Sequence, residues 1–70
     1  MLVSDTVLSI KVRNALQGDG EIGGLELRVH VLDGVVTLEG NAPDERAKLL
    51  AGELAEQVYG VEEVDNRIRI

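Results

Sequence analysis

The chain has 70 residues, enough for one domain and too few for two. Its 13 acidic and 7 basic residues give a net charge of −6. This charge argues against a general nucleic-acid-binding protein and against a polybasic membrane anchor, because both use positive charge to meet phosphate. The absence of cysteine excludes disulfides, thiolate nucleophiles and cysteine-ligated zinc.

The first predicted element is a helix that begins after the N-cap candidates Ser4 and Asp5 and ends before Gly18, which is expected to take the C′ position. Its buried stripe is formed by apolar residues spaced i, i+4, i+7 and i+8, namely Leu8, Val12, Ala15 and Leu16. A glycine-rich loop follows at residues 18–24, and we expect Ile22 to anchor this loop in the core.

A β-hairpin is predicted next. Residues 25–31 alternate strictly between apolar and polar, which is typical of a strand with one buried face. Asp33 and Gly34 favour a two-residue type I′ turn, because this turn needs positive φ at both central positions. Residues 35–39 form the returning strand, which ends at Gly40.

The second predicted helix opens within residues 41–45, where Pro43 takes the first helical position. The carboxylates of Asp44 and Glu45 suit the positive end of the helix dipole, and Asp44 is spaced to pair with Lys48 one turn later. The inward stripe is small and apolar, and it comprises Ala47, Ala51, Leu54, Ala55 and Val58, with Leu50 at its margin.

A third strand over residues 64–70 follows Gly60, which ends the second helix, and this strand turns Ile68 and Ile70 inward. The order α-β-β-α-β predicts an α+β domain with a three-stranded mixed sheet and both helices on one face. The simplest arrangement puts the first strand between the other two. The opposite face should be solvated and should carry polar side chains: Glu26, Arg28, His30, Thr37, Glu39, Arg67 and Arg69.

The loop at residues 18–24 matches two short ligand-binding motifs in spacing only. It contains the GxGxxG of dinucleotide sites and the GxxG of KH RNA-binding domains. A strand follows this loop where a helix would be needed, and the carboxylates of Asp19 and Glu21 would repel phosphate. Two carboxylates also supply too few oxygens for a dedicated calcium site. We interpret the segment as a solvated connection that binds no nucleotide, RNA or metal.

The titratable residues do not form a catalytic constellation in the sequence. His30 is the only histidine, and we interpret it as a surface residue paired across the hairpin with Thr37 or Glu39. The acidic residues of the second helix are interpreted as a solvated face: Asp44, Glu45, Glu53 and Glu56. We therefore expect no enzymatic activity, no cofactor and no metal.

A second apolar stripe on the first helix is the candidate interaction patch. It lies beside the core stripe and comprises Leu2, Val3, Val7 and Ile10. Two interpretations stay open: Val7 or Ile10 fills a seam between the two helices, or the patch contacts a lipid surface or a partner subunit. Leu49 and Tyr59 are lesser exposed candidates.

Two segments carry a family resemblance: DGVVTLEG at residues 33–40 and VYGVEEVDNRIRI at residues 58–70. Together with apolar matches in both predicted helices, they make the chain resemble the BON domain, which is named for bacterial OsmY and nodulation proteins. The resemblance implies the same α-β-β-α-β fold in a single domain over residues 1–70, with its core in residues 5–70.

The resemblance also implies a function. BON domains are regarded as non-catalytic modules that dock weakly on phospholipid membrane surfaces or membrane-associated proteins, and they recur in bacterial stress-related envelope proteins. The alternative is a structural module that forms a homo-oligomer through the first-helix patch or an unpaired strand edge. No basic region precedes a long apolar run at the N-terminus, so we expect a cytoplasmic location, whereas the family is often periplasmic.

Overall fold

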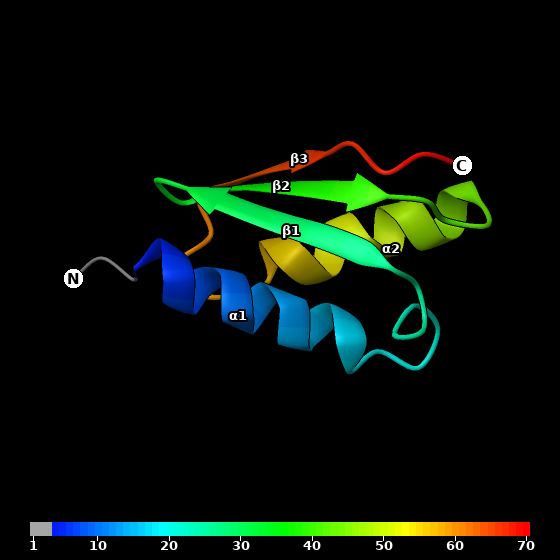
Figure 1. The fold of residues 1–70 in the computed structure, drawn as a ribbon, viewed down its shortest axis with the longest axis horizontal. Coiled ribbons are helices and arrows are strands. Elements are labelled where there is room, and N and C mark those ends of the chain that lie inside the picture. Colours follow the sequence, from blue (N-terminus) through cyan, green and yellow to red (C-terminus); the bar gives the residue numbers. More distant parts are fainter. Residues whose placement is uncertain (1–3) are drawn as a thin grey trace.

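The structure is a computed structural model that describes residues 4–70. Its elements follow the order α1 (Asp5–Gln17), β1 (Leu27–Leu32), β2 (Val35–Gly40), α2 (Glu45–Glu56) and β3 (Glu63–Asn66). Both helices lie on one face of the three-stranded sheet, and the opposite face is open (Figure 1). The predicted α+β architecture is confirmed.

The strand order differs from the predicted one. It is β1-β2-β3, so that β2 is the central strand and β1 lies at an edge. β1 and β2 pair antiparallel, and β2 and β3 pair parallel. The 12 residues of α2 span about 18 Å, the length of a short strand, so the helix returns the chain directly beside β2. The hairpin then leaves β1 on the other edge of β2, and the prediction of a central first strand was wrong.

The hairpin turn has the predicted backbone geometry. Asp33 has φ 51° and Gly34 has φ 81°, as a type I′ turn requires. The carboxylate of Asp5 accepts hydrogen bonds from the Asp33 N–H at 3.0 Å and from the Gly34 N–H at 3.4 Å. The first turn of α1 is thereby tied to the hairpin, and the Gly34 carbonyl accepts a further bond from the Glu62 N–H at 2.9 Å.

Replacing Asp5 by alanine should destabilise the domain by about 1–2 kcal/mol, because two N–H groups of the turn lose a charged acceptor. Urea unfolding followed by far-UV circular dichroism would measure this loss. Thr6→Ala changes the neighbouring exposed residue and should alter stability by less than about 0.5 kcal/mol. Equal stability of the two variants would show that the tie to the turn contributes nothing.

Ser4 caps α1 as predicted, since its hydroxyl accepts a hydrogen bond from the Val7 N–H at 3.2 Å. Gly18 does end this helix, but it does so as a C-cap with φ −80°. This is a right-handed conformation, so the expected C′ role for Gly18 was wrong. The Gly18 N–H donates to the Asn14 carbonyl at 2.9 Å and completes the last turn.

α2 starts two residues later than predicted, at Glu45 and not at Pro43. Asp44 is the N-cap, and its Oδ1 accepts from the Ala47 N–H at 2.9 Å. Pro43 therefore precedes the cap and does not occupy the first helical position. Within residues 4–70, Asp44 forms no ion pair with Lys48, because its carboxylate is engaged by the backbone. The helix ends at the C-cap Gln57, before the predicted stop at Gly60.

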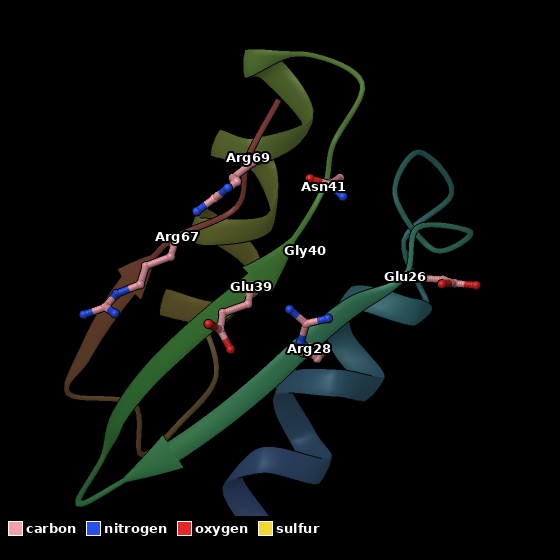
Figure 2. A pocket seen from close by; sticks show the side chains of 7 residues that line it. All are labelled: Glu26, Arg28, Glu39, Gly40, Asn41, Arg67 and Arg69. Carbon is pink, nitrogen blue, oxygen red and sulfur yellow. The ribbon is translucent and has the colours of Figure 1, made fainter.

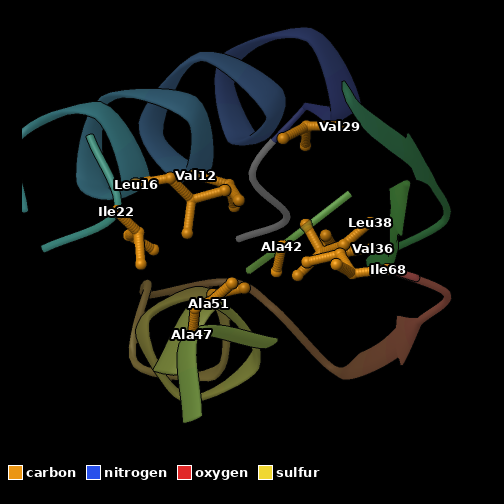
Figure 3. Packing of buried hydrophobic residues seen from close by; sticks show 11 residues of the cluster. Val12, Leu16, Ile22, Val29, Val36, Leu38, Ala42, Ala47, Ala51 and Ile68 are labelled. Carbon is orange, nitrogen blue, oxygen red and sulfur yellow. The ribbon is translucent and has the colours of Figure 1, made fainter. Parts of the chain in front are cut away.

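The core lies between the helices and the sheet (Figure 3). Ile22 is fully buried and anchors the glycine-rich loop, as predicted, while Ala15 is only half-buried. Small side chains let α2 lie close to the sheet. The core cluster comprises Val12, Leu16, Ile22, Val29, Val36, Leu38, Ala42, Ala47, Ala51, Ala55 and Ile68, and Leu8 is also fully buried.

The C-terminal segment departs from the predicted strand. β3 ends at Asn66, whose Nδ2 donates to the Lys48 carbonyl of α2 at 2.8 Å. Ile68 is buried as predicted, whereas Ile70 is 66% exposed, so its predicted inward position was wrong. Beyond β3, pairing continues only as an isolated parallel bridge between Arg69 and Asn41, and regular alternation does not extend to the end of the chain.

Candidate binding surfaces

The open face of the sheet is one of two candidate surfaces. Register places Arg28 of β1 opposite Glu39 of β2, and the Arg67 N–H donates to the Leu38 carbonyl at 2.9 Å, next to Glu39. The Arg69 N–H donates to the Gly40 carbonyl at 2.9 Å. These strands surround a shallow open hollow, hereafter the arginine hollow (Figure 2). Its lining residues are Glu26, Arg28, Glu39, Gly40, Asn41, Arg67 and Arg69.

Two ion pairs lie on this solvated face. The Nε2 atom of His30 is 3.2 Å from Oε1 of Glu39, which confirms the predicted cross-strand neighbour. The Nε–H of Arg67 donates to Oδ2 of Asp65 at 2.8 Å. All four side chains are well exposed, so each pair contributes about 0–1 kcal/mol. These pairs orient side chains more than they stabilise the fold.

The glycine-rich loop uses its carboxylates within the protein. Oδ1 of Asp19 accepts from the Glu21 N–H at 2.8 Å and from the Ile22 N–H at 3.2 Å. Glu21 in turn binds Arg46 of α2, with 2.8 Å between Oε1 and Nη2. The hydrogen bond to Glu21 raises the pKa of Arg46, which is protonated at neutral pH in any case. These contacts favour the interpretation of the loop as a connection.

Residues 4–70 contain no group of three or more His, Cys, Asp or Glu side chains placed to hold a metal ion. His30 lies on the open face of the sheet beside Glu39 and has no nucleophilic partner in the described hydrogen bonds.

The exposed apolar residues of α1 are the second candidate surface, hereafter the α1 patch. Val7 is 45% exposed and Ile10 is 49% exposed, so contact with α2 does not take them into a helix–helix seam. Leu2 and Val3, the other predicted members, lie outside the described residues. Figure 1 places α1 beneath the sheet, on the side away from the arginine hollow. The two candidate surfaces thus face different directions.

Other exposed apolar side chains are scattered. Leu49 and Tyr59 are exposed, as predicted. Leu32 is 71% exposed at the end of β1, and the sequence analysis missed it. Continuing the alternation from His30 by two residues would have placed Leu32 on the open face. Neither helix of the described chain is long and apolar enough to cross a bilayer.

A family model for the BON domain matches residues 4–70, which is nearly the whole chain. The chain belongs to the BON domain family. A comparison with curated proteins gave no match. Membership indicates a binding module at the level of the family.

The motif residues of this BON domain serve the fold. Asp33 and Gly34 form the turn, and Val36 and Leu38 are fully buried in the core. Gly40 has φ 133° where β2 ends. Because these positions build the scaffold, the family match by itself does not distinguish between the α1 patch and the arginine hollow as the binding surface.

Proposed function

We propose that this BON domain docks weakly and reversibly on phospholipid membrane surfaces, or on membrane-associated proteins, through the α1 patch. The observation that carries the proposal is the exposure of Val7 and Ile10, about half of each side chain, on a helix whose core stripe is already buried. About half of each of these side chains is left uncovered by the packing of the domain. An uncovered apolar stripe of this kind suits shallow insertion at an interface.

The energetics of the patch support weak binding. Complete burial of a valine or isoleucine side chain contributes about 1.5–3 kcal/mol, and about half of that remains available at Val7 and Ile10. The net charge of −6 gives no attraction to anionic lipid. We therefore propose a preference for zwitterionic vesicles, with the encounter on the cytoplasmic side of a membrane.

Vesicle flotation tests the proposal. The wild-type domain should float with phosphatidylcholine vesicles, and Val7→Asp combined with Ile10→Asp should abolish flotation, because two charges would enter the apolar boundary. Leu49→Asp is the matched control, since Leu49 is 56% exposed on α2 outside the patch. Circular dichroism would show that all variants are folded. Equal flotation of the double variant and the wild type would contradict the proposal.

Self-association is the second candidate function, and the strand order favours it specifically. β1 is an edge strand of six residues, and no strand within residues 4–70 pairs with its outer side. Unpaired edge strands are templates for pairing with a second copy. Sedimentation equilibrium over a wide range of protein concentration decides this point. A monomer at every concentration would eliminate the candidate.

A further inference from the structure

The sequence contains the dipeptide Asp-Gly twice, at Asp19–Gly20 and at Asp33–Gly34. The backbone nitrogen of the glycine can attack the side-chain carboxyl carbon of the aspartate, because glycine has no Cβ to hinder the approach. The nitrogen loses its hydrogen and the carboxyl group its hydroxyl, so one water molecule leaves and a five-membered succinimide forms. Water then opens this ring at either carbonyl and gives aspartate or isoaspartate, in which the main chain runs through the former side chain. Since both sites have the same chemistry, the fold determines which of them reacts.

The backbone at Asp33 is in the wrong conformation for this reaction. Its φ of 51° lies in the left-handed region, where ψ is about +47°. Ring closure needs the Gly34 nitrogen on the same side of the Cα–C bond as the Asp33 Cβ, and the left-handed conformation puts this nitrogen on the opposite side. The carboxyl carbon of Asp33 therefore cannot reach the nitrogen while the type I′ turn is intact.

Contacts from two other segments keep this turn closed. The carboxylate of Asp5 accepts from the Asp33 N–H at 3.0 Å and from the Gly34 N–H at 3.4 Å, so the attacking nitrogen is itself engaged. Gly34 is buried, and its carbonyl accepts from the Glu62 N–H at 2.9 Å. The turn can leave the left-handed conformation only if these bonds break together, and such an opening is rare.

Asp19–Gly20 is much less constrained. It lies in the glycine-rich loop, at the opposite end of the molecule from the hairpin turn (Figure 1). Asp19 has a negative φ, and Gly20 is exposed, with no atom within 4 Å of the position that a Cβ would take. The Asp19 carboxylate is held through Oδ1 alone, which accepts from the N–H groups of Glu21 at 2.8 Å and Ile22 at 3.2 Å. Breaking these two bonds frees the carboxyl group to turn toward Gly20.

We propose that Asp19 is a site of spontaneous isomerisation to isoaspartate, and that the fold protects the identical dipeptide at Asp33–Gly34. The reaction releases one water molecule and takes up another, so it needs no other co-reactant. Isoaspartate adds one carbon atom to the main chain and moves the carboxylate away from the N–H groups of Glu21 and Ile22. Because Ile22 anchors the loop in the core, the modification loosens this loop.

The test is a prolonged warm incubation of the whole chain at mildly acidic pH, because a neutral carboxyl group is the better electrophile. Trypsin places the two sites on separate peptides, residues 14–28 and 29–46, and electron-transfer fragmentation distinguishes isoaspartate from aspartate in each. In the folded domain, isoaspartate should form at least about tenfold faster at Asp19 than at Asp33. In urea the two rates should agree within about twofold, because the turn no longer exists. Equal rates in the folded domain, or no isoaspartate at Asp19, would overturn the proposal.

Two variants test the protection of Asp33. Asp5→Ala removes the acceptor of both turn N–H groups and should raise isomerisation at Asp33 by about tenfold, while the rate at Asp19 stays within about twofold. Val12→Ala truncates a fully buried side chain of the same helix and keeps Asp5, so it lowers global stability and leaves the turn tied. The rate at Asp33 should then stay within about twofold of the wild type. Equal acceleration in both variants would show that only global unfolding exposes Asp33, and would overturn the protective role of the turn contacts.

Discussion

Leu38→Ala should lower the free energy of unfolding by about 2–5 kcal/mol. Leu38 is fully buried on the central strand β2, where it faces both helices and pairs with Val29 of β1. Truncation of the Leu38 side chain leaves a cavity between the sheet and the helices. The core residues of α2 in this cluster are alanines, which are too small to fill the cavity. Ala51 and Ala55 are both fully buried and belong to the same core cluster.

The size of the domain makes this loss severe. A domain of 70 residues has a total stability of about 4–10 kcal/mol, so the variant would lose a large fraction of its free energy of unfolding. Urea unfolding by far-UV circular dichroism measures the change, since the chain has no tryptophan to serve as a fluorescent probe. Leu49→Ala, at an exposed position of α2, is the control and should change stability by less than about 0.5 kcal/mol. A similar loss in both variants would contradict the placement of the core.

The local elements of this fold were predictable because their signals act over a few residues. The turn at Asp33 and Gly34 is set by backbone geometry that few residue types adopt, and the structure has it. Ser4 caps α1 as predicted, whereas α2 is capped by Asp44, which the prediction had placed inside the first turn after Pro43. The type I′ turn and the cap of α1 were predicted correctly because the residues that form them lie within four positions of one another.

The order of the strands was not predictable in the same way. It depends on where α2 returns the chain, and this is set by packing of the whole helix against the sheet. The alternation of apolar and polar residues correctly predicted that Ile68 is buried. It wrongly predicted that Ile70 is buried, because nothing in the sequence pattern shows that β3 ends at Asn66. Errors of this kind come from tertiary contacts, which a local pattern does not contain.

The two candidate surfaces also differ in whether a local sequence pattern or a long-range contact defines them. Helical spacing alone identified Val7 and Ile10, and both are substantially exposed. The sequence also placed Arg28, Arg67 and Arg69 on the solvated face, but it did not predict their arrangement around Gly40. That arrangement requires β2 to lie between β1 and the C-terminal segment, so the wrong strand order concealed the arginine hollow.

Gly40→Ala should destabilise the domain by about 2–5 kcal/mol, through strained backbone and crowding together. The φ of 133° at Gly40 lies in a region that L-residues with side chains rarely adopt. A Cβ atom there would also lie 2.7 Å from the Glu26 carbonyl oxygen and 3.0 Å from Cδ2 of Leu27. The start of β1 would have to move, and the Arg69 N–H bond to the Gly40 carbonyl would be strained with it.

Two comparisons separate these causes in urea unfolding experiments. Gly20→Ala introduces the same methyl group into open space and should be neutral or stabilising by up to about 1 kcal/mol. Leu27→Ala removes one of the crowding atoms, but the Glu26 carbonyl oxygen belongs to the backbone and stays. In a double-mutant cycle, Leu27→Ala should therefore recover only a small part of the loss caused by Gly40→Ala. Full recovery would show that side-chain crowding, and not the backbone at Glu26, requires glycine at position 40.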